Sequence, residues 1–339
     1  MSGKTVSKGS GAERRFRAGV VLTSLCLCLS ACAVSEPVSD VPAANRPLLA
    51  PSSTITGARL YAPPGPVFGA LARPVPPAAA APTYLNFLAP SAVAARNNAM
   101  YVADIGHRQL LRYDAAYMAL SRFSDYPAAS VSALAVGPDM SLYVADADAG
   151  RVMHFSWDGR LLQGFSSDTA MGRPVGILLN DASGQVLVAD NLYNHVVIFN
   201  SLGRPSGTLK SLRTRSLAAM AGGPDGLYLV DRLGREVVVM GLDGEDRYVL
   251  GGGVLKDPAA IAVDGFNRVF VADAFDDSIK VFVDGEVAAS FGAGQGGASF
   301  NRIASLFIER DILYVADSMN RRIQTFRIAP PATARPANE

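Results

Sequence analysis

Cysteine is absent from almost the whole chain, because Cys26, Cys28 and Cys32 all lie within the first 32 of its 339 residues. A disulfide framework or a cysteine-based zinc site is therefore excluded from the rest of the sequence. Histidine is also scarce, with His107, His154 and His195 as its only copies. No phosphate-binding loop, Gly-x-Ser-x-Gly nucleophile motif or metal-binding helix motif is present. These absences remove most of the sequence signatures of catalysis.

A strong charge of either sign is missing too. The chain has 31 basic and 30 acidic residues and a formal net charge of +1. Residues 1–31 hold five of the basic side chains and one of the acidic ones, so the remainder carries a net charge of −3. A mildly acidic body does not favour nucleic acid as a partner, because nucleic-acid binding rests largely on neutralising phosphates.

The N-terminus has the three parts of an export signal in order. Arg14, Arg15 and Arg17 precede an apolar run over 18–29, which is shorter than the roughly 20 residues that span a bilayer. The run ends in Leu-Ser-Ala-Cys at 29–32, which resembles the lipobox of bacterial lipoproteins. The resemblance implies that residues 1–31 are a cleaved signal peptide and that Cys32 is lipidated. The alternative is an uncleaved N-terminal anchor with an incidental cysteine.

The lipoprotein resemblance also implies a cellular location. Ala33 stands where the family's inner-membrane retention signal has Asp, so the expected location is the cell envelope. The protein would be lipid-anchored at the outer membrane and face the periplasm or the cell surface. Residues 32–82 are rich in Pro, Ala and Ser and predict an extended tether, part of which supplies a strand to the fold.

The rest of the chain repeats itself. Tyr-Val-Ala-Asp or a close variant recurs six times at intervals of 41 to 44 residues. The repeated aspartates are Asp104, Asp146, Asp190, Asp231, Asp273 and Asp317. Around each one the pattern is strand, turn, strand ending in Asp, loop, strand, turn and strand. Four antiparallel strands in about 40 residues are typical of a β-propeller blade. We therefore expect an all-β, six-bladed propeller over 83–328, followed by a disordered Pro-rich tail over 329–339.

The last repeat carries a family resemblance. Val-Ala-Asp-Ser-Met-Asn-Arg-Arg-Ile-Gln-Thr-Phe at 315–326 is similar to the core signature of the NHL repeat. The other repeats match more loosely; His107 replaces the signature Asn in the first. The resemblance implies a six-bladed NHL propeller and leaves the function open, since one scaffold carries many activities.

A propeller closes its ring to remove exposed strand edges. The sixth repeat ends after its third strand, because the Pro-rich sequence from 329 onward cannot supply ladder donors. The missing strand is expected from the N-terminal side, within 59–88. The candidates are 59–61, 67–68 and 84–87, and the sequence does not choose among them.

The six aspartates at equivalent places suggest two roles, a metal site or a structural one. The structural role is favoured, since an Asp that ends a strand accepts backbone N–H groups from the following loop. Six copies spread one to a blade also lie far apart. No metal is expected, and no cofactor.

Catalysis on this fold is expected at the axial channel. In the related peptidyl-hydroxyglycine amidating lyases, a channel position carries a zinc-binding His in several blades. The equivalent positions here are Ser91, Ser132, Val175, Leu217, Ala259 and Ala304. They offer neither the ligands of a catalytic zinc nor the carboxylates of a calcium-dependent lactonase. This favours a non-enzymatic role, with a lyase or hydrolase of these types as the alternative.

Binding is expected on the face that holds the post-Asp loops and the segments leading into the innermost strands. The candidate residues are Arg173, Arg215, Arg302, Lys256, His107, Arg108, Tyr193, Asn194, His195, Arg232, Arg235 and Arg321. Arg and aromatic side chains are favoured at protein interfaces. In the tripartite-motif proteins, NHL propellers bind RNA on such a face. For an envelope protein, we expect a partner protein instead, with a glycan or small ligand as the alternative.

Overall fold

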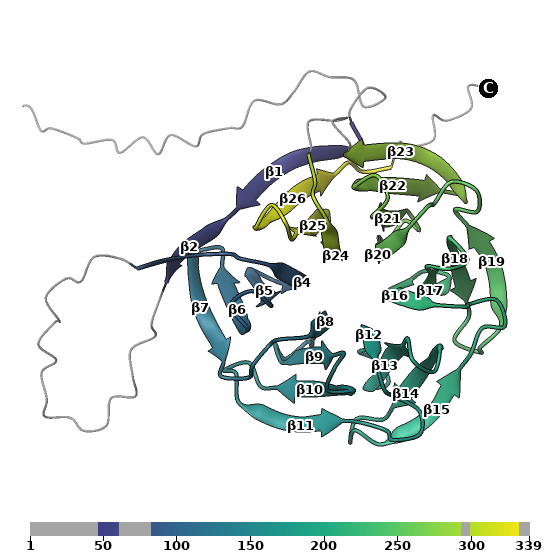
Figure 1. The fold of residues 1–339 in the computed structure, drawn as a ribbon, viewed down its shortest axis with the longest axis horizontal. Coiled ribbons are helices and arrows are strands. Elements are labelled where there is room, and N and C mark those ends of the chain that lie inside the picture. Colours follow the sequence, from purple (N-terminus) through teal and green to yellow (C-terminus); the bar gives the residue numbers. More distant parts are fainter. Residues whose placement is uncertain (1–46, 61–82, 293–298, 332–339) are drawn as a thin grey trace, which may run out of the picture. The chain divides into compact units, whose positions relative to one another are not determined.

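The computed structural model describes residues 47–60, 83–292 and 299–331. They form 26 β-strands and no helix, arranged as six sheets around a central axis (Figure 1). In the part that the structure describes, no helix is long and apolar enough to cross a membrane. The fold is the expected six-bladed β-propeller. The predicted signal peptide, Cys32 and residues 332–339 lie outside the described residues.

Each blade is an antiparallel sheet whose innermost strand lines the axis. The innermost strands are β4 (Pro90–Arg96), β8 (Val131–Val136), β12 (Pro174–Asn180), β16 (Leu217–Gly223), β20 (Pro258–Val263) and β24 (Ile303–Glu309). The second strands, each ending in a repeat Asp, are β5 (Ala99–Asp104), β9 (Leu142–Asp146), β13 (Gln185–Asp190), β17 (Gly226–Asp231), β21 (Val269–Asp273) and β25 (Ile312–Asp317).

The third and fourth strands complete the blades. The third strands are β6 (Gln109–Asp114), β10 (Arg151–Phe155), β14 (His195–Phe199), β18 (Glu236–Met240), β22 (Ser278–Val283) and β26 (Arg322–Ile328). The fourth strands are β7 (Ala119–Ser124), β11 (Leu161–Phe165), β15 (Pro205–Leu209), β19 (Asp246–Leu250), β23 (Glu286–Gly292) and, for the sixth blade, β1 (Leu49–Ile55).

Apolar packing between neighbouring blades holds the ring together. The second strands are buried on both faces, which explains their unbroken runs of Val, Ala, Leu and Tyr. The outer strands β15 and β19 show little alternation between buried and exposed residues and are largely exposed. The six apolar clusters therefore lie between blades and not in one central core.

The ring is closed by an N-terminal strand, as expected, but from an earlier segment than predicted. Strand β1 pairs with β26 from Leu49 opposite Ile328 to Ile55 opposite Ile323, and lies beside it in Figure 1. The prediction within 59–88 was therefore wrong. The stretch 49–55 contains Pro51 and three polar residues, so it lacks a strand pattern, and only the open edge of β26 selects it.

Two further strands extend the first blade. Strand β2 (Gly57–Leu60) runs parallel to β7, and β3 (Tyr84–Asn86) pairs antiparallel with β2. The 59–61 and 84–87 candidates thus contribute to the first blade instead of the sixth, while 67–68 lies outside the described residues. Because β1 belongs to the sixth blade and β2 to the first, one continuous segment links the two ends of the ring.

Candidate functional site

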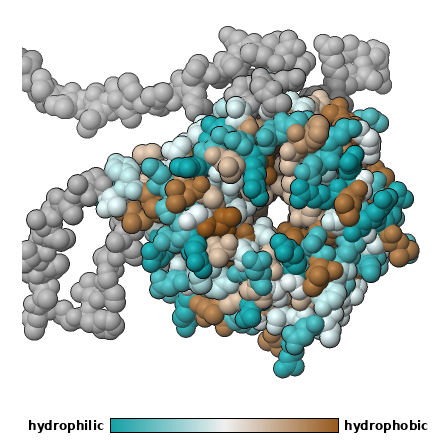
Figure 2. All heavy atoms as spheres, viewed as in Figure 1, coloured by the Kyte–Doolittle hydropathy of each residue, from teal (hydrophilic) through white to brown (hydrophobic). Residues whose placement is uncertain are grey.

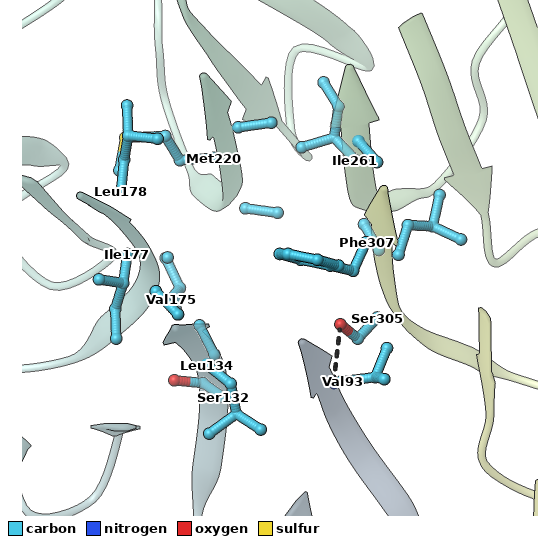
Figure 3. A pocket seen from close by; sticks show the side chains of 18 of the residues that line it. Val93, Ser132, Leu134, Val175, Ile177, Leu178, Met220, Ile261, Ser305 and Phe307 are labelled. Atoms are coloured by element: carbon cyan, nitrogen blue, oxygen red, sulfur yellow. Dashed lines mark hydrogen bonds between the residues drawn. The ribbon is translucent and has the colours of Figure 1, made fainter. Parts of the chain in front are cut away.

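The innermost strands enclose an axial channel with a volume of about 530 Å³. Side chains from all six of them face it, and Figure 3 shows Phe307 of β24 pointing toward its centre. The other large lining side chains include Val93, Leu134, Ile177, Met220 and Ile261. The channel opens as a narrow gap at the centre of the ring in Figure 2. Its side-chain wall is mainly apolar.

Serine hydroxyls in the channel wall link neighbouring blades. Ser91 Oγ donates to the Val131 carbonyl oxygen at 2.9 Å, and Ser132 Oγ donates to the Pro174 carbonyl oxygen at 2.7 Å. Each bond joins one innermost strand to the next. These hydroxyls therefore already have acceptors, and no base lies beside them to activate an attack.

One ion pair lies at the channel end away from the repeat aspartates. Arg96, the last residue of β4, places Nη2 3.1 Å from Asp181 Oδ2, just after β12. Its Nη1 donates to the Val136 carbonyl oxygen at 2.9 Å. This arrangement connects the first three blades at the rim of the channel.

One predicted channel position was wrong by a single residue. Leu217 pairs with Asp231 and is fully buried, so it corresponds to Pro174, which pairs with Asp190 in the third blade. Its neighbour Ala218 lines the channel instead. The register is set by the pairing of β16 with β17, which the local sequence does not show. Ala218, like Leu217, has no titratable side chain, so the corrected position adds no catalytic group to the channel wall.

The six repeat aspartates are buried, and each carboxylate accepts several hydrogen bonds. Asp190 accepts from the Gly172, Arg173 and Tyr193 amides at 2.6 to 2.9 Å. Asp104 accepts in the same way from the Leu88, Ala89 and His107 amides. In five blades the carboxylate therefore ties the loop after the second strand to the segment that leads into the innermost strand. Asp231 accepts from that segment alone, through the Arg215 and Ser216 amides. Across the described residues, no group of three or more His, Cys, Asp or Glu side chains could hold a metal.

The three histidines do not converge. His107 Nε2 lies 2.8 Å from the Asn86 carbonyl oxygen, and His195 Nε2 lies 2.6 Å from that of Ala170. His154 stacks on Tyr143 with ring centroids 4.0 Å apart. Both nitrogens of His154 are buried without a hydrogen-bond partner in the described structure. Burial lowers the pKa of this imidazole, and the nearby Asp139 carboxylate offsets part of the effect.

The candidate binding residues share one end of the ring. Each repeat Asp lies opposite the first residue of its innermost strand, as Asp104 does with Pro90, so the post-Asp loops and the segments before those strands meet there. We call this end the Asp-loop face. The candidate cations that are exposed on it are Arg108, Arg173, Arg215, Arg232, Arg235, Lys256, Arg302 and Arg321.

Some of the candidate side chains have partners within the fold. Arg232 forms a bidentate ion pair with Asp257, with Nη2 2.8 Å from Oδ2. Asn194 bridges the third and fourth blades, since its amide nitrogen donates to the Thr214 carbonyl and its Oδ1 accepts from the Leu217 amide. These two side chains are committed to structure, as are the ring nitrogens of His107 and His195 described above.

The remaining cations alternate with exposed apolar side chains over the third to sixth blades. Residues Leu192, Leu233, Phe275 and Met319 stand two places after their repeat Asp and are 59% to 72% exposed. Arg173, Arg215, Lys256 and Arg302 are exposed beside the innermost strands of the same four blades. Among the described residues, none of these four cations forms a side-chain ion pair. We call these eight residues the crescent.

The sequence predicted the cations of the crescent and placed Phe275 and Met319 in the post-Asp loops, but Leu192 and Leu233 were missed. The signal was present, because an apolar residue two places after the repeat Asp occurs in four consecutive repeats. Gly106 and Asp148 occupy that place in the first and second blades. The crescent therefore covers one side of the Asp-loop face and leaves the other side without the same pattern.

No protein-family model matches the chain, and no curated protein matches it in sequence. Solved structures match it in fold. Virginiamycin B lyase from Staphylococcus aureus is 12% identical with a TM-score of 0.55, over 72% of this chain and 85% of that one. A protein of unknown function from Bacteroides thetaiotaomicron is 15% identical with a TM-score of 0.60, over 71% of this chain and 70% of that one.

These neighbours are β-propellers, and the chain itself is a six-bladed β-propeller. At 12% to 15% identity the likeness concerns the fold alone, since one propeller scaffold carries unrelated activities.

Proposed function

We propose that this protein is a lipid-anchored, NHL-type propeller that binds a partner protein in the cell envelope without catalysing a reaction. The observation that supports this proposal is the crescent on the Asp-loop face. Exposed apolar side chains next to cations without ion-pair partners in the described chain form a surface that a partner can desolvate and neutralise. The partner that fits has acidic side chains around apolar ones.

The wall of the axial channel supports a binding role over catalysis. Ser91 and Ser132 donate to backbone carbonyls, and Ser305 accepts from the Val93 amide. The charged pair among the described lining residues, Arg96 with Asp181, lies at the end of the channel. A nucleophile needs an adjacent base, and a catalytic zinc needs three protein ligands. Among the described lining residues neither set is present.

The lipid anchor is proposed from the sequence at 14–32, with thioether attachment at Cys32 and an outer-membrane location. Metabolic labelling with a radioactive or clickable palmitate tests it on the full chain. We expect label on the wild type and none on Cys32→Ser. Label on that variant, or none on the wild type, would contradict the anchor.

Position-specific photocrosslinking in intact cells tests the docking face. A benzophenone amino acid replaces Leu233 or Phe275 in the crescent, and Leu162 on the outer strand β11 serves as the matched exposed control. We expect one discrete adduct from the two crescent positions and none from the control.

A charge reversal provides the second arm of this experiment. Arg215→Glu together with Lys256→Glu should abolish the adduct while leaving the thermal unfolding midpoint within a few degrees, because both side chains are exposed. Equal crosslinking from Leu162, or an adduct that survives the reversal, would exclude the crescent as the docking surface.

A lyase is the second candidate, because virginiamycin B lyase and streptogramin B lyase structures share the fold. A lyase of that group has also been solved with quinupristin as a catalytically inactive His-to-Ala variant. In the present chain, no histidine lies among the described residues that line the channel. This difference weakens the lyase interpretation.

A further inference from the structure

The face opposite the Asp-loop face carries its own set of exposed apolar side chains. They lie in turns between strands and are Tyr117 (81% exposed), Met118 (71%), Trp157 (63%), Leu202 (71%), Leu242 (57%) and Phe266 (64%). We call them the apolar rim. The first five lie in the turns between third and fourth strands of the first four blades, and Phe266 lies between β20 and β21 of the fifth.

The regularity of the apolar rim requires an explanation. Single exposed apolar residues are normal on a protein surface. Here, however, each of five consecutive blades places a large one at the same end of the ring, and three of the six residues are aromatic. Two of these aromatic residues, Tyr117 and Trp157, have a polar edge, and such side chains are favoured at the boundary between lipid and water.

In the sixth blade, the incoming chain takes the place of the turn between the third and fourth strands. Its third and fourth strands are β26 and β1, so no turn joins them, and the chain enters at Leu48 where the turn would be. The Ala329 amide donates to the Leu48 carbonyl oxygen at 2.9 Å. Arg268, from the β20–β21 turn next to Phe266, donates to the Ala329 carbonyl oxygen at 2.6 Å. The N-terminal segment therefore meets the propeller at the apolar rim.

The proposed lipidation site is close to this point in the sequence. About 15 residues separate Cys32 from Pro47, which can extend to at most about 50 Å. An anchor at Cys32 would therefore keep the apolar rim at a high effective concentration near the lipid surface.

The charges of the same turns define the kind of lipid surface. In the turns at this end of the ring, acidic side chains outnumber basic ones: Asp139, Asp158, Asp181, Asp225, Asp243, Glu245, Asp264, Asp284 and Asp311 against Arg160, Arg204, Arg268 and Arg310. Such a face gains nothing from anionic headgroups and is repelled by them at low salt. The contact must come from the apolar side chains themselves.

We infer that the apolar rim rests on a zwitterionic lipid surface, so that the Asp-loop face points away from the membrane toward its partner. The inference rests on the proposed lipid anchor at Cys32. It assigns opposite tasks to the two faces: one contacts phosphatidylethanolamine or phosphatidylcholine headgroups and upper acyl chains, and the other remains available to protein.

Trp157 permits a direct test because it is the only tryptophan in the protein. The lipidated full chain is reconstituted into phosphatidylcholine vesicles with and without lipids brominated on the upper acyl chain. We expect the Trp157 emission to be blue-shifted and quenched by the brominated lipid. The same protein in detergent-free solution after enzymatic removal of the tether should emit as an exposed indole.

Two triple variants distinguish the contribution of the apolar rim from that of the lipid anchor. Leu202→Ser, Leu242→Ser and Phe266→Ser together should abolish quenching while the protein still floats with the vesicles. Leu192→Ser, Leu233→Ser and Phe275→Ser, on the other face, should leave the quenching unchanged. Replacing part of the phosphatidylcholine by phosphatidylglycerol should reduce quenching at low salt.

The outcomes distinguish this inference from the proposed anchor. Wild-type protein that fails to float with vesicles would overturn the lipid anchor. Protein that floats, but whose Trp157 emits as in water and is not quenched, would overturn the rim contact alone. Quenching that needs anionic lipid and disappears at high salt would also overturn it.

Discussion

The carboxylate that ends each second strand positions the backbone of the crescent. Asp190 accepts from the Arg173 amide, and Asp231 accepts from the Arg215 amide at 2.9 Å. Asp273 accepts from the Lys256 amide at 2.9 Å. The backbone that carries three of the crescent cations is therefore held before any partner arrives, which lowers the entropy lost on binding.

The loop after each repeat Asp also requires an unusual backbone conformation at one residue. The fourth position after the Asp has a positive φ in all six blades: Arg108, Gly150, Asn194, Arg235, Asp277 and Arg321. Three of the six are arginines, although Gly and Asn adopt this conformation at less cost. The fold therefore accepts local strain to place cations on the Asp-loop face, which is consistent with a binding role there.

His154 should make the protein acid-sensitive. Burial lowers the pKa of its imidazole below the usual 6.5, so the unfolded chain takes up a proton more readily than the folded one. The corresponding stability is present above pH 6.5 and decreases as the pH falls through the interval below it. We expect His154→Phe to remove that part of the pH dependence and to raise stability by about 1 kcal/mol, because no unpaired nitrogen remains buried.

Urea denaturation of wild type and His154→Phe between pH 5 and pH 8 measures this effect. The other two histidines are present in both proteins, so the difference between the curves isolates His154. Parallel curves across the whole range would show that its imidazole does not control acid stability.

At the scale of strands, closure of the ring depends on a segment far from its partner in sequence. Strand β1 is the outer strand of the sixth blade, and Ser53 bonds to Thr325 across 272 positions. Only Leu49 of β1 is deeply buried, inside the apolar cluster between the fifth and sixth blades. The strand is thus held by its ladder and by one main apolar contact.

Leu49→Ala should destabilise the closed ring by about 3 kcal/mol, since it removes a buried leucine side chain from that cluster. Leu60→Ala is the matched control, because Leu60 lies on the neighbouring strand β2 and is 39% exposed. We expect the control to cost less than about 1 kcal/mol. Guanidinium denaturation checks both values, and equal losses would show that β1 does not close the ring through Leu49.

At the scale of the whole molecule, the two ends of the ring differ in their side chains. The Asp-loop face presents the crescent, and the opposite face presents the apolar rim among acidic turns. The channel between them is apolar and holds one ion pair at its end. Two different faces of this kind fit the proposed tethered scaffold, and catalysis in the channel would need convergent polar groups.

This difference predicts the result of an activity test against the lyase alternative. Purified protein incubated with quinupristin and divalent cations should leave the compound unchanged, as measured by mass spectrometry over time. A virginiamycin B lyase serves as the positive control. Conversion that depends on the protein would overturn the non-enzymatic proposal and require catalytic groups that the described channel wall does not contain.

The sequence predicted the fold from local information. The repeat Asp, the apolar strands and their spacing of 41 to 44 residues each lie within one blade, so a single repeat already shows them. The cations of the candidate face were found for the same reason. The position of Ala218 was missed, because the register of β16 is set by its pairing with β17 and not by its own sequence.

What the sequence by itself determined is therefore the six-bladed architecture and the need for an N-terminal strand to complete it. Only the tertiary structure decided that the strand is Leu49–Ile55 and that the apolar rim and the chain entering at Leu48 share one face. The physical reason is that blade patterns arise from neighbouring residues, whereas ring closure joins edges at opposite ends of the body. The strand is chosen by its pairing with the outer edge of β26, more than 260 residues away in sequence.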